Sequence, residues 1–255
     1  MGTIQHPHLK WYIENGFHSV HGYCKKHTAY VLDLIEQSPY NKKGKGVAEI
    51  GIHVGRFYIL LNRTVTSPEF KSYAIDLFES AQEKNIDNSG RGNLQYFIEN
   101  LKHHDLYEGN NTVILEGDST DSGMKFDNII EPGSLKYVSI DGGHTPTHVV
   151  NDLKLAEKWI ESEGVVIVDD IMHEGWVGVV QGTLNYLSSH PTHQPFAIGY
   201  NKLWLSKVSV RQTYKYILEN SPIARTSYEG GPHRQMFGGY EIMTLEDSGH
   251  VNDGA

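Results

Sequence analysis

The sequence lacks several features that would place it in other classes of protein. It has a single cysteine, Cys24, so no disulfide can form within the chain, and we expect a reducing, cytoplasmic environment. It has no uninterrupted apolar run of about 20 residues, the length that a membrane-spanning helix requires. Its first residues lack the charged start and apolar core of a secretory signal. We therefore expect no contact with a membrane.

Positive charge is also scarce. The 255 residues include 22 lysines and arginines against 31 acidic residues, a formal net charge of -9. Because a protein that binds a phosphate backbone needs a basic surface, we expect no nucleic-acid partner. One local basic strip exists, and we interpret it as a solvated face: Lys202, Lys207, Arg211 and Lys215. The length suits a single domain with elaborations.

Short apolar segments alternate with amphipathic ones along the chain. Five segments have the length and composition of buried strands: residues 46–50, 72–75, 111–115, 135–140 and 164–168. Two later candidates are residues 196–205 and 240–245. Strands that alternate with helices predict an α/β fold in which a mainly parallel, seven-stranded sheet carries helices on both faces. In such a sheet, ligands bind beyond the carboxyl ends of the strands.

The helices are predicted from their apolar faces and their N-terminal residues. Thr145 is a good N-cap and Pro146 suits the first helical position. Further helices are expected near residues 30–35, 56–62, 93–101 and 176–187. We divide the chain into an N-terminal helical extension (1–40), a main domain (41–246) and a flexible tail (247–255). The glycine-rich stretch 228–237 is expected to be a loop, either a lid over a substrate or a plain surface connection.

A glycine turn follows the first predicted strand, between Glu49 and Gly55. Its glycines let the backbone approach a ligand closely, and Asp76 follows at about the interval expected of a residue that binds ribose hydroxyls. The spacing is not G-x-G-x-x-G. The Glu49 carboxylate would repel a pyrophosphate, but it would suit a sulfonium ligand with an amino group. The alternatives are a helix N-cap for Asp76 and a turn residue for Asp118, which follows the third strand.

The order of these motifs is similar to that of a known family. E-x-G-x-x-x-G at 49–55, Asp76, Gly117–Ser119, Asp141–His144 and Asp169–Asp170 together resemble class I S-adenosylmethionine-dependent methyltransferases. More narrowly, they resemble the metal-dependent sugar O-methyltransferases of macrolide and aminocoumarin biosynthesis and their cephalosporin-pathway relatives. The resemblance implies the Rossmann-like class I methyltransferase fold, with S-adenosylmethionine as the methyl donor. The chain departs from the family at His53, where many members have a glycine.

The resemblance also implies which residues bind the donor. They belong to the glycine turn and to the ends of the strands that follow: Glu49, Gly51, His53, Gly55, Asp76, Leu77, Asp118, Ser119 and Asp141. Two of these, Glu49 and Asp76, carry the charge that would select an amino group and a ribose.

Three acidic residues follow neighbouring predicted strands. Asp141 ends the fourth strand, and Asp169 and Asp170 end the fifth. Adjacent parallel strands lie about 5 Å apart, so these carboxylates can meet, and clustered carboxylates repel one another unless a cation joins them. Oxygen ligands suit Mg²⁺, Mn²⁺ or Ca²⁺. The resemblance implies that all three residues bind a divalent metal, with Mg²⁺ the first choice. The alternative is that they cap the next helices or lie on an ordinary surface.

A histidine follows the first of these aspartates. His144 stands three residues after Asp141, beyond two glycines that allow a sharp turn back over the strand ends. Histidine titrates near neutral pH and suits removal of a hydroxyl proton. The resemblance implies that His144 is the general base, next to Asp141 as a second catalytic residue. The alternative is a loop histidine without chemistry, and His173 is the reserve candidate for the base.

These features predict an S-adenosylmethionine-dependent, metal-assisted O-methyltransferase that acts on a hydroxylated small molecule. The first choice of acceptor, by resemblance, is a sugar hydroxyl of a natural product or glycan, and the second is a catechol-like phenol. An NAD-linked oxidoreductase on a similar sheet is an alternative, as is a non-catalytic protein that has kept the fold. A homo-oligomer is left open.

Overall fold

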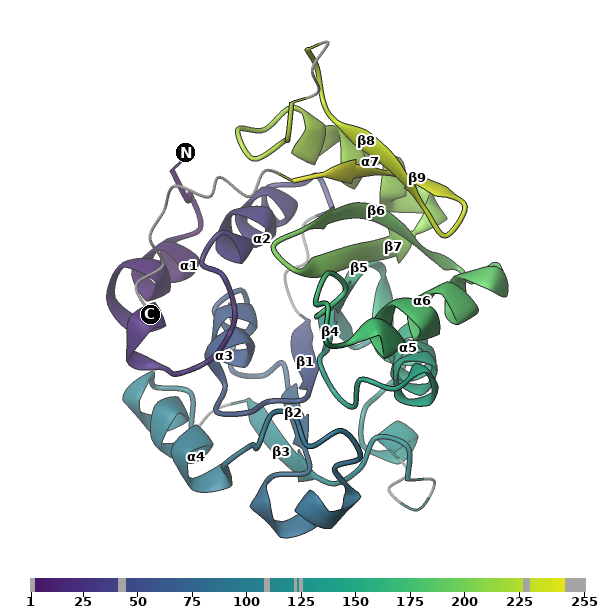
Figure 1. Cartoon of the computed structure of the whole chain (residues 1–255). Coiled ribbons are helices and arrows are strands. Elements are labelled where there is room, and N and C mark those ends of the chain that lie inside the picture. Colours follow the sequence, from purple (N-terminus) through teal and green to yellow (C-terminus); the bar gives the residue numbers. More distant parts are fainter. Residues whose placement is uncertain are drawn as a thin grey trace.

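The computed structural model describes residues 3–40, 45–107, 111–121, 123, 126–226 and 230–245. Within them the strands form one nine-stranded sheet in the order β3-β2-β1-β4-β5-β7-β6-β9-β8 (Figure 1). The strands are β1 Gly46–Ile50, β2 Ser72–Asp76, β3 Thr112–Glu116, β4 Leu135–Ile140, β5 Ile160–Val168, β6 His193–Gly199, β7 Lys202–Lys207, β8 Arg234–Phe237 and β9 Tyr240–Thr244. The pairs among β1 to β5 are all parallel, as the alternation of elements predicts.

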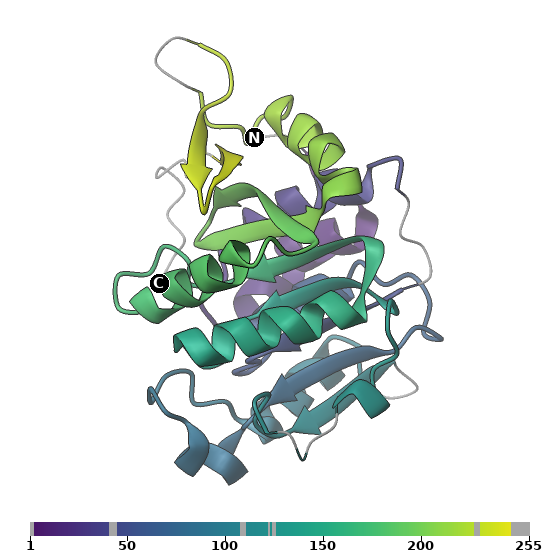
Figure 2. The ribbon, with the colours of Figure 1, turned by 90° about the vertical axis from the view of Figure 1, so that its right-hand side faces the viewer.

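Helices cover both faces of this sheet (Figure 2). They are α1 Pro7–Trp11, α2 Thr28–Glu36, α3 Arg56–Asn62, α4 Leu94–His103, α5 Pro146–Trp159, α6 Val177–Ser188 and α7 Val208–Glu219. The alternation of β5 explains the two layers, because Val165 and Ile167 enter one core while Val166 and Val168 enter the other. Helices α5 and α6 pack on the second face. No helix in the described ranges is long and apolar enough to cross a membrane.

The strand order changes direction between β1 and β4. The chain runs outward from β1 through β2 to β3, then returns to place β4 on the other side of β1. The ladders continue just past the strand ends, since the Asp141 amide donates to the Ile50 carbonyl and the Asp169 amide to the Ile140 carbonyl, at 2.8 and 2.9 Å. Asp141 and Asp169 therefore emerge side by side at the switch point, where ligands bind in such folds.

The predicted count of seven strands is wrong. Residues 196–205, predicted as one strand, belong to the hairpin of β6 and β7, whose turn residues Tyr200 and Asn201 have φ angles of 57° and 63°. Two consecutive positive φ angles make the tight turn that suits a twisted hairpin. Gly238 and Gly239 make a similar turn between β8 and β9, so residues 234–237 are a strand where a loop was predicted. Residues 227–229 and 246–255, which include the predicted tail, lie outside the described residues.

The interpretation of the basic strip as a solvated face is also wrong. Lys202 and Lys215 are buried, and Lys215 forms an ion pair with Glu241. Arg211 donates from Nε to the Pro195 carbonyl at 2.8 Å. The spacing of these residues suggests a solvated face, but the charged ends of Lys202, Arg211 and Lys215 are paired with groups from other elements.

A substitution in the glycine turn after β1 would test how tightly the switch point is packed. A Cβ at Gly51 would lie 1.8 Å from the Asp141 carbonyl oxygen, and its φ is +88°. We expect Gly51→Ala to lower the free energy of unfolding by about 2–6 kcal/mol, because strain and overlap add. Gly90→Ala is the matched control, since φ is +47° there but a Cβ would meet open space. Denaturant unfolding measures both, and equal losses would contradict the proposed overlap.

Candidate active site

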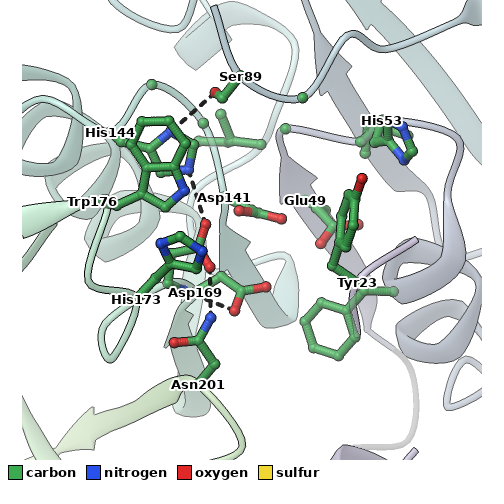
Figure 3. Close-up of a pocket in the computed structure, with 18 of the residues that line it drawn as sticks. Tyr23, Glu49, His53, Ser89, Asp141, His144, Asp169, His173, Trp176 and Asn201 are labelled. Carbon is green, nitrogen blue, oxygen red and sulfur yellow. Dashed lines mark hydrogen bonds and ion pairs between the residues drawn. The ribbon is translucent and has the colours of Figure 1, made fainter. Parts of the chain in front are cut away.

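A cavity of about 1050 Å³ opens at the carboxyl edge of the sheet. Nearly all the residues predicted as functional line it, namely Glu49, Gly51, His53, Asp76, Leu77, Asp118, Ser119, Asp141, His144, Asp169 and Asp170. Gly55 is not among them, because it begins α3 with φ +96° and packs against Phe97. Figure 3 shows His144 and Trp176 on one side of the cavity, Glu49 and His53 on the other, and Asp141 between them.

Asp76 stabilises the turn that it faces. Its Oδ2 accepts hydrogen bonds from the amides of Ile52 and His53, at 2.6 and 3.0 Å, and its Oδ1 accepts from the Phe78 amide at 2.7 Å. Burial raises the pKa of Asp76, although these three backbone donors oppose that rise. The carboxylate is thus part of the turn's framework, and its predicted contact with a ribose stays a prediction.

His53 adopts the backbone conformation that the family's glycine would suit. Its φ is 54°, in the left-handed region. The side chain packs against His21 and Tyr23, with ring centroids 5.3 and 5.9 Å apart. His53 therefore takes a conformation that glycine adopts readily, and its ring places an aromatic wall against the N-terminal segment.

Glu49 is a buried acid, and one of its carboxylate oxygens lacks a hydrogen-bond partner among the described residues. The residue is only 1% exposed, and its Oε1 has no hydrogen-bond partner among the described residues. Burial raises the pKa of Glu49 to about 8, against the opposing pull of the Lys202 ammonium. Since a buried polar group is normally paired, this oxygen is suited to accept a donor group from a ligand in the cavity.

Lys202 is the cation of this site, and sequence analysis assigned it wrongly to a surface. Its side chain is buried, forms an ion pair with Asp169 and lies 4.0 Å from the centroid of the Phe57 ring. Burial lowers the pKa of Lys202, but the attraction of Asp169 together with that of other nearby acidic groups, Asp141 among them, outweighs burial, so the net shift is upward. The pairing of β5 with β7 sets Val168 opposite Leu203 and so brings the two residues together. No local sequence signal reports such a pairing.

His144, not Asp169, joins Asp141 and Asp170 in the cluster able to hold a metal ion. One ligand atom from each of these three residues lies within 4.8 Å of the others. Burial and the neighbouring Asp169 raise the pKa of Asp141. Asp170 has φ 56°, and its Oδ1 accepts from the Asn201 amide group at 2.6 Å. The predicted trio of aspartates does meet at one edge, but Asp169 is engaged by Lys202.

His144 lies between two carboxylates. Its Nε2 is 3.1 Å from Oδ2 of Asp170, and its Nδ1 is 2.9 Å from Oδ2 of Asp87. The ring also stacks on Trp176, with centroids 4.3 Å apart. Burial lowers the pKa of His144, but the hydrogen bonds to Asp170 and Asp87 outweigh it and raise the pKa overall. Asp87 was missed because it lies in a polar stretch without a recognisable pattern.

The remaining candidates have plainer surroundings. Asp118 accepts from the amide and hydroxyl of Thr120, at 2.8 and 2.7 Å, as the alternative of a turn residue predicts, while it also lines the cavity. His173 stacks on Trp176 at 5.8 Å and accepts from the Gly175 amide at Nδ1, 3.1 Å away. His173 therefore forms part of the cavity wall beside His144.

Comparison with known proteins shows what the segment that holds this site is similar to. Residues 48–171 match the family model described as a methyltransferase domain. The matched segment runs from β1 to the first residue beyond the Asp169–Asp170 pair, so it contains the whole glycine turn and the acidic edge. No curated protein matches the chain.

Several solved structures share the fold. The O-methyltransferase NovP is 16% identical, with a TM-score of 0.54, over 71% of this chain and 79% of that one. A putative caffeoyl-CoA O-methyltransferase from Staphylococcus aureus is 17% identical, with a TM-score of 0.53, over 80% of this chain and 92% of that one. CalS11, a TDP-rhamnose 3'-O-methyltransferase of calicheamicin biosynthesis, is 15% identical, with a TM-score of 0.52, over 79% and 92%. These likenesses confirm the predicted fold.

The burial of Glu49 predicts how the stability of the ligand-free protein depends on pH. Because its folded-state pKa is raised to about 8, the folded protein keeps a proton that the unfolded chain releases above its ordinary pKa of 4.5. The stability that the protonated Glu49 side chain contributes to the folded protein is therefore lost as pH rises from about 4.5 to 8. We expect Glu49→Gln to gain melting temperature relative to the wild type over this range.

The matched control for that measurement is Glu116→Gln, at an exposed position that ends β3. Thermal unfolding of the three proteins at several pH values between 5 and 9 provides the test. A constant difference between Glu49→Gln and the wild type across this range would contradict the raised pKa.

Proposed function

We propose that this chain, whose residues 48–171 match the family model of a methyltransferase domain, transfers the methyl group of S-adenosylmethionine to a hydroxyl oxygen of a small molecule. The observation that carries the proposal is the shared cavity. The Glu49 carboxylate, whose Oε1 has no partner among the described residues, and the His144 imidazole line the same space from opposite sides, with Asp141 between them (Figure 3). A donor and an acceptor can therefore meet above Asp141.

The donor would occupy the side of the cavity formed by the turn after β1. Glu49 would accept from the amino group of the methionyl part, which would supply the missing partner of its Oε1. Asp76 would face the ribose, and Asp118 and Ser119 at the end of β3 would face the adenine. The other predicted donor residues, Gly51, His53, Leu77 and Asp141, also line the cavity. Gly55 would act through the start of α3 instead.

The acceptor would occupy the side next to His144. Trp176 and His173 present stacked rings there, and Met172 and Ile86, which also line the cavity, are exposed apolar side chains. Such surfaces are buried when a ligand binds. A ring that carries hydroxyls fits this wall, so a sugar of a natural product or glycan is the first choice and a catechol-like phenol the second. CalS11, which shares the fold, is described as acting on TDP-rhamnose.

A divalent cation fits the cluster of Asp141, His144 and Asp170, because three potential ligand atoms lie within 4.8 Å of one another and two are carboxylate oxygens. We propose Mg²⁺, held chiefly by Asp141 and Asp170, while Lys202 already neutralises Asp169. When bound, the cation lowers the pKa of a chelated hydroxyl and fixes its position. The protein's own contribution is to align the acceptor oxygen with the methyl carbon and to receive the hydroxyl proton on His144.

The two alternatives have less support. An NAD-linked oxidoreductase would place a pyrophosphate near the Glu49 carboxylate, which repels it, and the matching family model is that of a methyltransferase. A non-catalytic protein with this fold would have no use for a histidine held between two carboxylates in a cavity. Calorimetry with S-adenosylmethionine and with NAD separates these candidates from the proposed enzyme.

Removal of the proposed base should affect turnover and spare donor binding. We expect His144→Ala to lower kcat by about 10²- to 10⁴-fold, because general base catalysis contributes about that much. The donor Kd should stay close to that of the wild type, since His144 lies on the acceptor side. Turnover on a panel of glycosides and catechols, with calorimetry of the donor, measures both. A parallel loss of donor affinity would show that His144 serves the donor instead.

Removal of the metal should separate the two halves of the site. We expect a chelator to abolish methyl transfer, and added Mg²⁺ to restore it, while S-adenosylmethionine still binds through Glu49 and the turn after β1. In Asp170→Asn, recovery should require a higher Mg²⁺ concentration, because one carboxylate ligand is lost. Turnover that persists after complete chelation would remove the metal from the mechanism.

A further inference from the structure

Asp87 holds His144 by two hydrogen bonds. The Asp87 Oδ2 accepts from the His144 backbone amide at 2.7 Å and lies 2.9 Å from the ring Nδ1. The other carboxylate oxygen accepts from the amide and hydroxyl of Ser89. Both oxygens are thus committed, one to the imidazole and the other to the loop that carries Asp87. The hydrogen bonds from Ser89 fix the orientation of the Asp87 carboxylate, and the carboxylate in turn fixes the orientation of the His144 ring.

The remaining contacts of the ring distinguish its two nitrogens. Trp176 stacks on one face of the imidazole, and the Ser89 hydroxyl lies 3.1 Å from Nδ1, on the same side as Asp87. Nε2 points the other way, toward Asp170. A carboxylate that accepts the Nδ1 proton fixes which nitrogen can receive another. In this arrangement that nitrogen is Nε2.

The loop of Asp87 also touches the proposed donor side. Its far end is attached to the turn after β1, since the Asn93 amide donates to the His53 carbonyl at 3.1 Å. A Cβ at Gly92 would lie 2.5 Å from Oδ1 of Asp76, so the loop backbone passes directly over that carboxylate. Residues 85–93 therefore contact Asp76, the residue proposed to bind the ribose, near one end and His144, the proposed base, near the other.

We propose that Asp87 is a positioning residue for His144, and that residues 85–93 transmit donor binding to the base. This inference rests on the proposed function. In the reaction, the acceptor oxygen forms a bond to the methyl carbon as the sulfur–methyl bond breaks, and the bonding pair stays on sulfur. The hydroxyl proton moves to Nε2 of His144, while the Nδ1 proton stays in its hydrogen bond to Asp87. A donor that occupies Asp76 stabilises the loop and so the orientation of the ring.

The kinetic test compares Asp87→Ala with the wild type. We expect kcat to fall about 10- to 100-fold, as for other residues that orient a reacting group, with the acceptor KM unchanged and any loss of donor affinity far smaller than the loss of kcat. Asp87→Glu should recover part of the rate. The control is Asp121→Ala. Like Asp87, Asp121 accepts a hydrogen bond from the backbone amide two residues further on, that of Gly123 at 2.8 Å, but it does not line the cavity. Unchanged kcat in Asp87→Ala, or a loss matched by a fall in melting temperature and donor affinity, would overturn the proposal.

A second measurement does not need turnover. In protein with ¹⁵N-labelled histidine, the His144 ring signal is identified by its loss in His144→Gln. We expect a hydrogen-bonded Nδ1 proton that shifts when S-adenosylhomocysteine binds, and we expect Asp87→Ala to lose both the signal and the shift. If these hold while no acceptor is methylated, the proposed function fails and the link between loop and base stands. If the acceptor is methylated but the His144 ring signal is the same in Asp87→Ala as in the wild type, only the proposed link between the loop and the base fails.

Discussion

Acidic side chains from several segments converge on one cavity, and their mutual repulsion must be relieved inside the protein. Two unit charges 4 Å apart interact by about 4 kcal/mol near a protein surface, a large share of the 5–15 kcal/mol that stabilises a typical domain. The structure relieves the repulsion with one ammonium group and one imidazole. Lys202 pairs with Asp169, and His144 lies between Asp87 and Asp170. Glu49 and Asp141 lack such a partner at short range, and burial raises the pKa of both, as it does that of Asp76.

This distribution of charge divides the cavity by chemistry. Glu49 and the turn after β1 face one side, where a cationic methyl donor would meet the Glu49 carboxyl group, whose pKa burial raises above its ordinary value. His144, Asp170 and the aromatic wall of Trp176 face the other, where an acceptor would lose a proton. Asp141 lies between the two and belongs to both proposed sites. The sheet makes this possible because β1 and β4 end in register at the switch point.

Much of the fold could be predicted because its signals are local. The apolar segments from β1 to β5 alternate with helices that begin at recognisable caps, such as Thr145 followed by Pro146. The hairpins near the C-terminus were harder, because Tyr200 is an unusual residue for the first of two consecutive positive φ angles. Gly238 and Gly239 did carry a readable turn signal. The strand count was wrong at these two turns, where backbone conformation decides the topology and composition indicates it only weakly.

The sequence by itself determined the order of elements, the acidic residues at the strand ends and the histidine beyond Asp141, since each depends on neighbours in the chain. Only the tertiary structure decided which acid meets which cation. Asp169 and Lys202 are 33 residues apart and meet through the pairing of β5 with β7. Asp87 and His144 are 57 apart and meet through a loop without a pattern. Such contacts are set by strand register and loop path, and neither is encoded in the spacing of the residues that make them.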